Sequence, residues 1–170
     1  MEITDHFKIP VSGLGNGLHG YDFSIEDDFF QAFESSPIRK GTVAVHLDFD
    51  KREDLYVMDF SMEGTVNAAC DRCLDHFGLP IENRQRLLVK FDEKEWEDAD
   101  VIHILKGTPS LNVAKYIYEF IVLAVPLGKT HDDAGESCNP DMLKYLDSEE
   151  GDKPAPNPFK DALKDLDFEN

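Results

Sequence analysis

The feature that most constrains how this chain can fold is a Cys-x-x-Cys pair, Cys70 and Cys73, in the segment Cys70-Asp71-Arg72-Cys73-Leu74. The third cysteine, Cys138, lies far downstream in a loop that also contains His131. Two thiols at this spacing, together with a distant thiol and an imidazole, are typical of a tetrahedral zinc site. If all of them bind one ion, the segments around Cys70 and Cys138 must be neighbours in the folded protein.

The fourth ligand of such a site has two candidates. His131 shares a turn-rich loop with Cys138, whereas His76 follows Cys73 so closely that we expect it to be drawn along the outgoing strand. We therefore predict a structural zinc ion bound by Cys70, Cys73, His131 and Cys138, with His76 as the alternative to His131. Four protein ligands favour a closed structural site, because a catalytic zinc site keeps one position open.

Two other interpretations of the cysteines stay open. In the first, Cys70 and Cys73 form a reversible dithiol in a redox-responsive protein. Such a pair normally opens a helix whose N-terminus lowers the thiol pKa, but Gly78-Leu79-Pro80 disfavours a helix directly after this pair. In the second, the three cysteines of a sheet protein bind nothing.

Length and composition favour one compact domain. The chain has 170 residues, of which 41% are hydrophobic, which is ample material for one core. We predict a single domain over residues 1–146 and an acidic flexible tail over residues 147–170. No stretch approaches the roughly 20 apolar residues that cross a bilayer, and the first twenty residues contain no apolar run typical of a signal peptide. We therefore expect an intracellular protein, in a reducing compartment that favours thiols held as metal ligands over disulfides.

The net charge of −18 bears on the choice of partners. Seventeen basic residues against 35 acidic ones give no global field for nucleic acid. The acid is concentrated in residues 92–100, with six acids and one Lys, and in residues 147–170, with eight acids and three Lys. We interpret both runs as solvated surface, with docking to a basic protein as the alternative, and a local basic face elsewhere is compatible with the sequence.

Hydrophobic alternation predicts most of the sheet. Residues 7–11 are expected to form a short edge strand, because Pro10 cannot donate a hydrogen bond. Strands with a period of two are predicted over residues 42–49, 56–69, 77–91 and 101–105. A bulge at Gly64 is expected in the second of these. Since strands run into and out of the cysteine pair, the pair is predicted to lie at the tip of a long antiparallel hairpin.

Helices are predicted in four places. Ser24 and Asp27 resemble a capping box that opens a helix over residues 25–35, preceded by a glycine-rich loop over residues 12–20. Asn112 is the expected N-cap of an apolar helix that stops before Pro126. The remaining two are short helices after Asn139-Pro140 and after Asn157-Pro158. The predicted fold class is α+β: an antiparallel sheet with a long hairpin, packed by two to three helices, and a zinc knuckle at the hairpin tip.

Several of these segments together resemble the YceD family, the large ribosomal RNA subunit accumulation proteins. The resemblance covers residues 20–146 and is carried by Gly64-Thr65-Val66, by the cysteine pentapeptide, by Leu123-Ala124-Val125-Pro126-Leu127 and by the His-bearing loop closed by Cys138. It implies a cytoplasmic, non-enzymatic factor needed for accumulation of large-subunit ribosomal RNA and for ribosome assembly. The implied partners are ribosomal RNA, a basic ribosomal protein or a large-subunit precursor.

Two further groups of residues are candidates for function. An RNA contact in so acidic a protein would need a local basic strip, for which the candidates are Arg72, Arg84, Arg86 and Lys90; the alternative is an ordinary solvated strand face. Asp48 and Asp50 are candidate Mg²⁺ ligands for an enzyme. No general base of distinctive context accompanies these two carboxylates, so we expect that the protein is not an enzyme.

Overall fold

A computed structural model describes residues 6–34, 36–98 and 100–146. It divides the chain into two units, Met1–Cys138 and Asn139–Asn170. The described part of the second unit is the helix α3 (Pro140–Leu146), in which the Asn139 side chain accepts a hydrogen bond from the Asp141 N–H at 3.0 Å, as its sequence predicts. The predicted tail over residues 147–170, with its last helix, lies outside the described residues.

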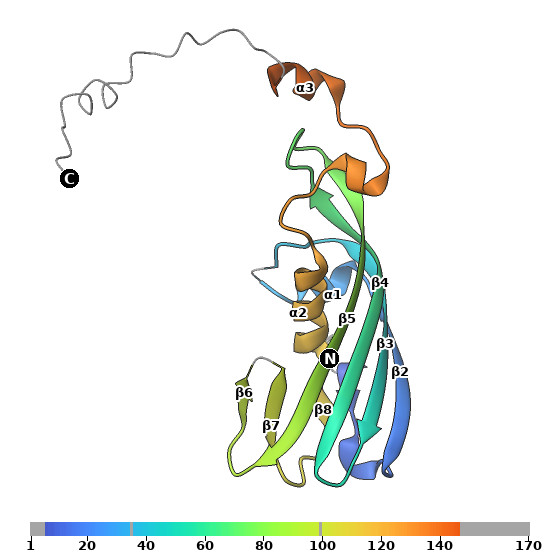
Figure 1. Cartoon of the computed structure of the whole chain (residues 1–170), viewed down its shortest axis with the longest axis vertical. Coiled ribbons are helices and arrows are strands. Elements are labelled where there is room, and N and C mark those ends of the chain that lie inside the picture. The colour runs from blue at the N-terminus through green and yellow to red at the C-terminus, as the bar shows by residue number, and fades with distance from the viewer. Residues whose placement is uncertain (1–5, 35, 99, 147–170) are drawn as a thin grey trace, which may run out of the picture. The chain divides into compact units, whose positions relative to one another are not determined.

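The first unit is built on a mixed six-stranded sheet (Figure 1). Its strands, in spatial order, are β2 (Gly17–Ile25), β3 (Gly41–Lys51), β4 (Leu55–Ala69), β5 (His76–Asp92), β7 (Val101–Leu105) and β6 (Trp96–Asp98). Neighbouring strands are antiparallel except β5 and β7, which are parallel. The predicted α+β class is therefore confirmed, with a long hairpin and a mostly antiparallel sheet. The parallel pairing of β5 with β7 departs from the predicted antiparallel sheet.

The remaining elements of this unit are short, apart from one helix. The edge strand β1 (Lys8–Ile9) pairs with β8 (Leu111–Asn112) in a separate two-stranded sheet. The other elements are the 3-10 turn η2 (Val11–Gly13), helix α1 (Asp27–Gln31), helix α2 (Ala114–Ala124) and the 3-10 turn η3 (His131–Ala134). The prediction of Asn112 as the N-cap of α2 is wrong: Asn112 pairs with Lys8 as the last residue of β8, and Val113 takes the N-cap position without a side-chain cap. The Asn112 side chain still accepts a hydrogen bond from the Ala114 N–H at 3.0 Å, at the start of the helix.

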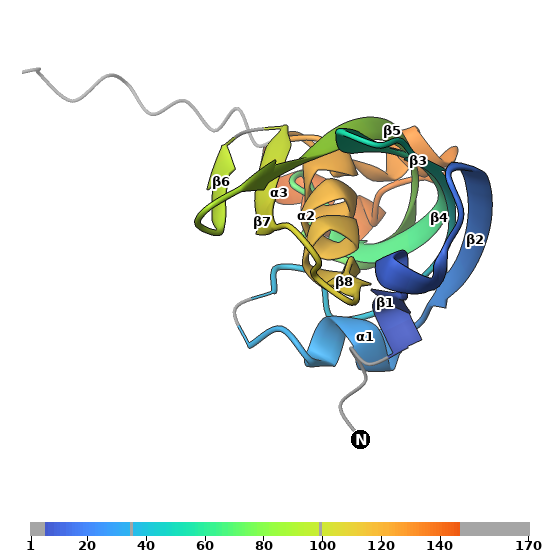
Figure 2. The same ribbon diagram turned by 90° about the horizontal axis from the view of Figure 1, so that it is seen from below.

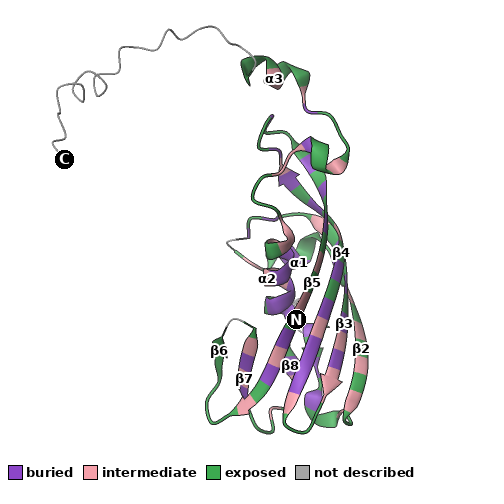
Figure 3. Ribbon diagram, viewed as in Figure 1, coloured by how far each residue is buried: buried purple, intermediate pink, exposed green. Residues whose placement is uncertain are grey.

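The core lies between the curved sheet and α2. Figure 2 shows the strands bending around this helix, and Figure 3 shows burial alternating along the strands. The ring of Phe120 on α2 packs edge-on against that of Phe60 on β4, with 5.2 Å between centroids. The Asn83 side chain on β5 donates a hydrogen bond to the Phe120 carbonyl at 2.9 Å. Burial of an aromatic side chain such as Phe120 contributes about 1.5–3 kcal/mol to stability. The buried face of α2 therefore orients the helix against the sheet and fixes the position of its C-terminal end.

Gly64 lies in an uninterrupted ladder, so the predicted bulge is wrong. It pairs with Val43 on one side and Ile81 on the other, and the register continues unchanged past it. A Cβ at this position would lie 2.2 Å from the carbonyl oxygen of Thr42. The glycine is thus required for close approach of two backbones.

Two predictions near the N-terminus are also corrected. The predicted glycine-rich loop is shorter, because β2 already begins at Gly17. Ser24 lies inside β2, paired with Ala44, and α1 begins after Glu26 without any side-chain cap. The physical reason is that the inward residues of β2 continue the alternation of the sheet, which outweighs a local capping pattern.

Candidate metal centre

The turn between β4 and β5 forms a knuckle that presents two thiols. The Cys70 N–H donates to the Asp75 carbonyl and the Leu74 N–H donates to the Cys70 carbonyl, both at 2.9 Å. Leu74 adopts a φ of 65°, which a branched side chain rarely does. The Arg72 N–H donates to the Cys70 sulfur at 3.4 Å. The backbone thus folds so tightly that both sulfurs of Cys70 and Cys73 face the same side.

The segment after α2 supplies the other two side chains. Thr130 and Asp133 form a capping box that starts η3, and His131 is the first residue of that turn. Gly135 ends it with a φ of 71°, where a glycine is favoured. The Glu136 N–H then donates to the His131 carbonyl at 2.9 Å, which turns the chain towards Cys138.

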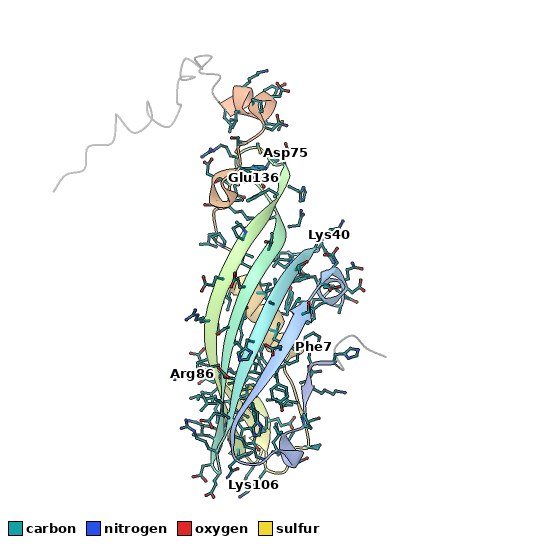
Figure 4. All side chains as sticks on the ribbon, turned by 90° about the vertical axis from the view of Figure 1, so that its right-hand side faces the viewer. Phe7, Lys40, Asp75, Arg86, Lys106 and Glu136 are labelled. Carbon is teal, nitrogen blue, oxygen red and sulfur yellow. The ribbon has the colours of Figure 1, made fainter. Side chains whose placement is uncertain are left out.

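The knuckle and this second segment are joined by hydrogen bonds between Asp71 and Lys129. The Asp71 N–H donates to the Lys129 carbonyl at 2.8 Å, and the Lys129 N–H donates to the Asp71 carboxylate at 2.7 Å. This bond and the Lys129 ammonium lower the pKa of Asp71. Arg72 forms an exposed ion pair with Asp132 at 3.0 Å, which adds little energy. Figure 4 shows Asp75 and Glu136 at the same end of the sheet.

All four residues predicted from the sequence come together at this contact. Cys70, Cys73, His131 and Cys138 are buried, and their candidate ligand atoms lie within 4.8 Å of one another. The Cys70 and Cys138 sulfurs are 3.7 Å apart, and the Cys73 sulfur is 3.4 Å from His131 Nδ1. His76 is exposed on β5, outside the cluster.

The cluster fits a metal ion in size and chemistry. Tetrahedral zinc with bonds of about 2.0–2.3 Å has its ligand atoms about 3.3–3.8 Å apart, which matches the sulfur–sulfur distance of 3.7 Å and the sulfur–nitrogen distance of 3.4 Å. Three thiols and one imidazole are soft donors of the kind that select zinc, copper(I) or iron–sulfur groups over magnesium and calcium. The four side chains together can hold such an ion.

The charges of the thiols are also unusual. Burial opposes ionisation of Cys70, but hydrogen bonds from the backbone N–H groups of Cys73 and Arg72 and from His131 outweigh it and lower the pKa of Cys70 to about 6. Burial raises the pKa of Cys138, and its neighbours Cys70 and Cys73 raise it further. Thiols packed this closely resist ionising together, because the negative charges of neighbouring thiolates repel one another. A cation bound between them would offset this repulsion.

The other candidate residues do not converge on a site. Arg84 pairs with Glu82 at 3.6 Å, and Arg86 makes two hydrogen bonds to Asp59, at 2.6 and 3.0 Å. Lys90 is exposed near the far end of β5. The guanidinium groups of the predicted basic strip are therefore locally neutralised, and Arg86 lies well away from the knuckle (Figure 4).

The two carboxylates considered as magnesium ligands have basic partners instead. Asp48 lies 3.4 Å from His46, and Asp50 lies 2.7 Å from Arg52. The Asp22 carboxylate, which bonds the other nitrogen of His46, is the main cause of that residue's raised pKa. These are the charge pairs of an exposed sheet face.

The contact between Asp71 and Lys129, which joins the two segments that carry the cluster, is a feature that the sequence did not reveal. Asp71 lies inside the Cys-x-x-Cys loop, but nothing in its spacing identifies Lys129 as its partner. The one signal in the sequence is a carboxylate between the two cysteines, which is able to accept hydrogen bonds from another segment.

Fold and site together define a class: a mixed α+β protein whose longest hairpin carries half of a buried Cys/His cluster able to hold a metal ion. The family model for the large ribosomal RNA subunit accumulation protein YceD matches residues 58–167, and the chain belongs to this family. The match begins in β4 and includes all four cluster residues. No curated protein and no solved structure matches the chain. Within the described residues, no helix has the length and apolar character to cross a membrane.

Proposed function

We propose that this protein is a non-enzymatic factor for accumulation of large-subunit ribosomal RNA and for ribosome assembly, and that its Cys/His cluster is a structural zinc site. Membership of the YceD family is the observation that carries the proposal, since the family description names ribosomal RNA accumulation. The family description supplies the process, and the buried Cys/His cluster supports the proposal of a structural metal site.

Cys70, Cys73, His131 and Cys138 would hold the zinc ion. When bound, zinc neutralises the buried thiolates and cross-links the tip of β4–β5 to the segment after α2. The protein's own part is to orient these side chains: the knuckle aims two sulfurs, and the capping box on η3 aims the imidazole. The Asp71–Lys129 hydrogen bonds align the two segments.

Two observations support a role without catalysis. The cluster offers four protein ligands, so a tetrahedral ion would have no position left for water or substrate. Each of the four residues is at most 8% exposed, which leaves a substrate no route to the ion.

We propose ribosomal RNA, a basic ribosomal protein or a large-subunit precursor as the partner, and the cytoplasm as the location. The net charge of −18 suits a basic protein surface, because opposite charge steers association. An adaptor that binds a basic protein without touching RNA is the alternative within this class.

The experiment that tests this function is sedimentation of ribosomal particles from cells lacking the protein. We expect a lower ratio of large to small subunits, restored by the wild-type chain. Cells whose profile is unchanged by the loss would refute the assembly role and leave the zinc argument standing.

The redox alternative was expected for Cys70 and Cys73, but the thiol pair that one observation favours is Cys70 and Cys138, whose sulfurs lie 3.7 Å apart. Peroxide would oxidise these two thiols to a disulfide and be reduced to water, with the thiol protons consumed in the water. Metal analysis of the purified protein separates the two proposals. One zinc per chain supports the structural site, whereas a zinc-free protein with a reversible disulfide supports the redox role.

A further inference from the structure

A pocket of about 410 Å³ lies beside the metal centre in the first unit. Its walls come from the segment before β3, the end of β4, the start of β5, the end of α2 and Lys129. The volume falls within the range of about 300–1,000 Å³ typical of ligand sites. The pocket is thus shaped by the same contact that brings the metal ligands together.

The lining of the pocket combines an apolar wall with a basic rim. Val122 and Val125, which are both partly exposed, contribute to the wall, and Arg39, His76 and Lys129 carry the basic groups. No carboxylate is found among the described residues that line it. In a chain with 35 acids and 17 Lys and Arg residues, this is a marked local reversal of charge. By contrast, a pocket of about 500 Å³ beside β6 and β7 is lined by both signs of charge, with Glu95 and Glu97 beside Lys115.

The backbone segments that carry Arg39 and Lys129 are held in place by hydrogen bonds. The Asn67 N–H on β4 donates to the Lys40 carbonyl at 2.9 Å, and the Gly41 N–H donates to the Asp27 carboxylate at 2.9 Å. Together these bonds hold the segment that carries Arg39. Lys129 is held through its backbone by Asp71.

The charge on the rim is only partly compensated. The Arg39 guanidinium donates to the backbone carbonyl of Glu34 at 3.1 Å, a neutral acceptor that leaves its charge in place. The Lys129 ammonium lies 3.4 Å from Asp71, the nearest opposing carboxylate. Lys40, exposed beside Arg39, adds a further positive charge at this end of β3 (Figure 4).

We propose that this pocket binds one nucleotide of single-stranded RNA, with a phosphate on Arg39 and Lys129 and the base against the valine wall. Arginine and lysine are the usual donors to phosphate, and single strands offer unstacked bases that apolar walls can accept. His76 stands at the rim, where its ring can stack on a base or donate to a phosphate. The choice of RNA over an acidic peptide rests on the proposed function.

Fluorescence anisotropy with the full chain and a labelled twelve-nucleotide RNA tests the proposal. Loss of one charged hydrogen bond in Arg39→Ala should weaken binding about tenfold and reduce the slope of log K against log salt by about 0.7. Val125→Trp fills the pocket and should weaken binding with an unchanged slope. Arg52→Ala removes the same charge from an exposed residue that does not line the pocket, and should bind like the wild type.

The outcomes separate binding in the pocket from binding elsewhere on the surface. Wild-type binding by both Arg39→Ala and Val125→Trp would refute the site, as would a wild-type protein that does not bind the RNA. Displacement by oligoglutamate at the same concentration as unlabelled RNA would identify a peptide site and overturn the proposal. A mononucleotide should compete more weakly than the strand, because it lacks the neighbouring phosphates. Equal thermal midpoints and zinc contents show that each variant is folded.

Failure here and failure of the proposed function are distinguishable. If the purified protein binds no RNA, but cells lacking it still have a lower ratio of large to small subunits, only the assignment of the pocket is refuted. If its loss leaves the ribosomal particles unchanged while RNA binding follows the expected pattern, the assembly role falls and the binding site remains.

Discussion

The sulfur atoms of Cys70 and Cys138 lie 3.7 Å apart, although 68 positions of sequence separate the two residues. Cys70 comes from the tip of the longest hairpin and Cys138 from the last residue of the first unit. Closing so long a loop costs conformational entropy that grows with the logarithm of its length. An ion that holds both residues offsets this cost, so metal and stability should be coupled in this protein.

We predict one zinc per chain and a strong dependence of stability on it. Removing the ion with a chelator, or replacing Cys138 by Ser, should lower the unfolding midpoint by at least about 5 °C, since a cross-link over a long loop contributes about 2–4 kcal/mol. Elemental analysis and calorimetry of the same preparation measure both. A metal-free wild-type protein with an unchanged midpoint would contradict the site.

The identity of the fourth ligand is tested by a pair of histidine variants. His131→Ala should lower zinc affinity at least about tenfold, because a buried ligand is lost, whereas His76→Ala should keep wild-type zinc content, since His76 is exposed and outside the cluster. Competition with a chromophoric chelator measures the affinity. The reverse order of effects would assign the imidazole to His76.

Gly64→Ala should destabilise the sheet by about 1–3 kcal/mol, the usual cost of inserting a methylene group into a packed site. The new Cβ would meet the Thr42 carbonyl at 2.2 Å, so β3 and β4 must separate locally. Gly15→Ala is the matched control, because nothing lies within 4 Å of a Cβ there. Urea denaturation of the two variants gives the comparison. Equal free energies of unfolding would show that the ladder adapts without cost.

The Glu97 carboxylate should make the free energy of unfolding depend on pH in the acid range. Hydrogen bonding by Lys115, followed by that of Tyr116, lowers the pKa of Glu97 from its ordinary value of 4.5. A lowered folded-state pKa means that the contribution is complete above about pH 5 and is lost as pH falls below about 4. Since Glu97 is half exposed, Glu97→Gln should cost less than about 1 kcal/mol at pH 7.

The acid range provides the check on Glu97. The difference in unfolding free energy between Glu97→Gln and the wild type should shrink as the pH falls from 5 to 3, when the wild-type carboxyl also becomes neutral. Denaturation curves at three pH values measure it. A difference that stays constant over this range would show that the variant acts through packing and not through charge.

Strands β3, β4 and β5 could be predicted from the sequence because each buries one face, so Val45, Phe60 and Leu87 belong to alternations of period two. The grouping of the cluster residues was predictable for a different reason. Cys70 and Cys73 share a turn that points both sulfurs the same way, and His131 shares a segment with Cys138.

What could not be predicted depends on pairing between distant segments. Gly17 and Gly20 weaken the hydrophobic signal of β2, whose position is set by its ladder with β3. The parallel pairing of Val101 with Leu88 depends on how the chain turns after β5 and leaves no mark in the alternation. The basic pocket draws its residues from five separate parts of the chain, so no local pattern indicates it.

The position of Cys138 at the end of the first unit has a consequence for synthesis. The chain emerges from its N-terminus, so the β4–β5 hairpin with Cys70 and Cys73 is made well before the segment that carries His131 and Cys138. Until Cys138 has been synthesised, the cluster lacks at least one of its four side chains. If the cluster binds a metal ion, that site can be completed only after translation has delivered Cys138, the last residue of the first unit.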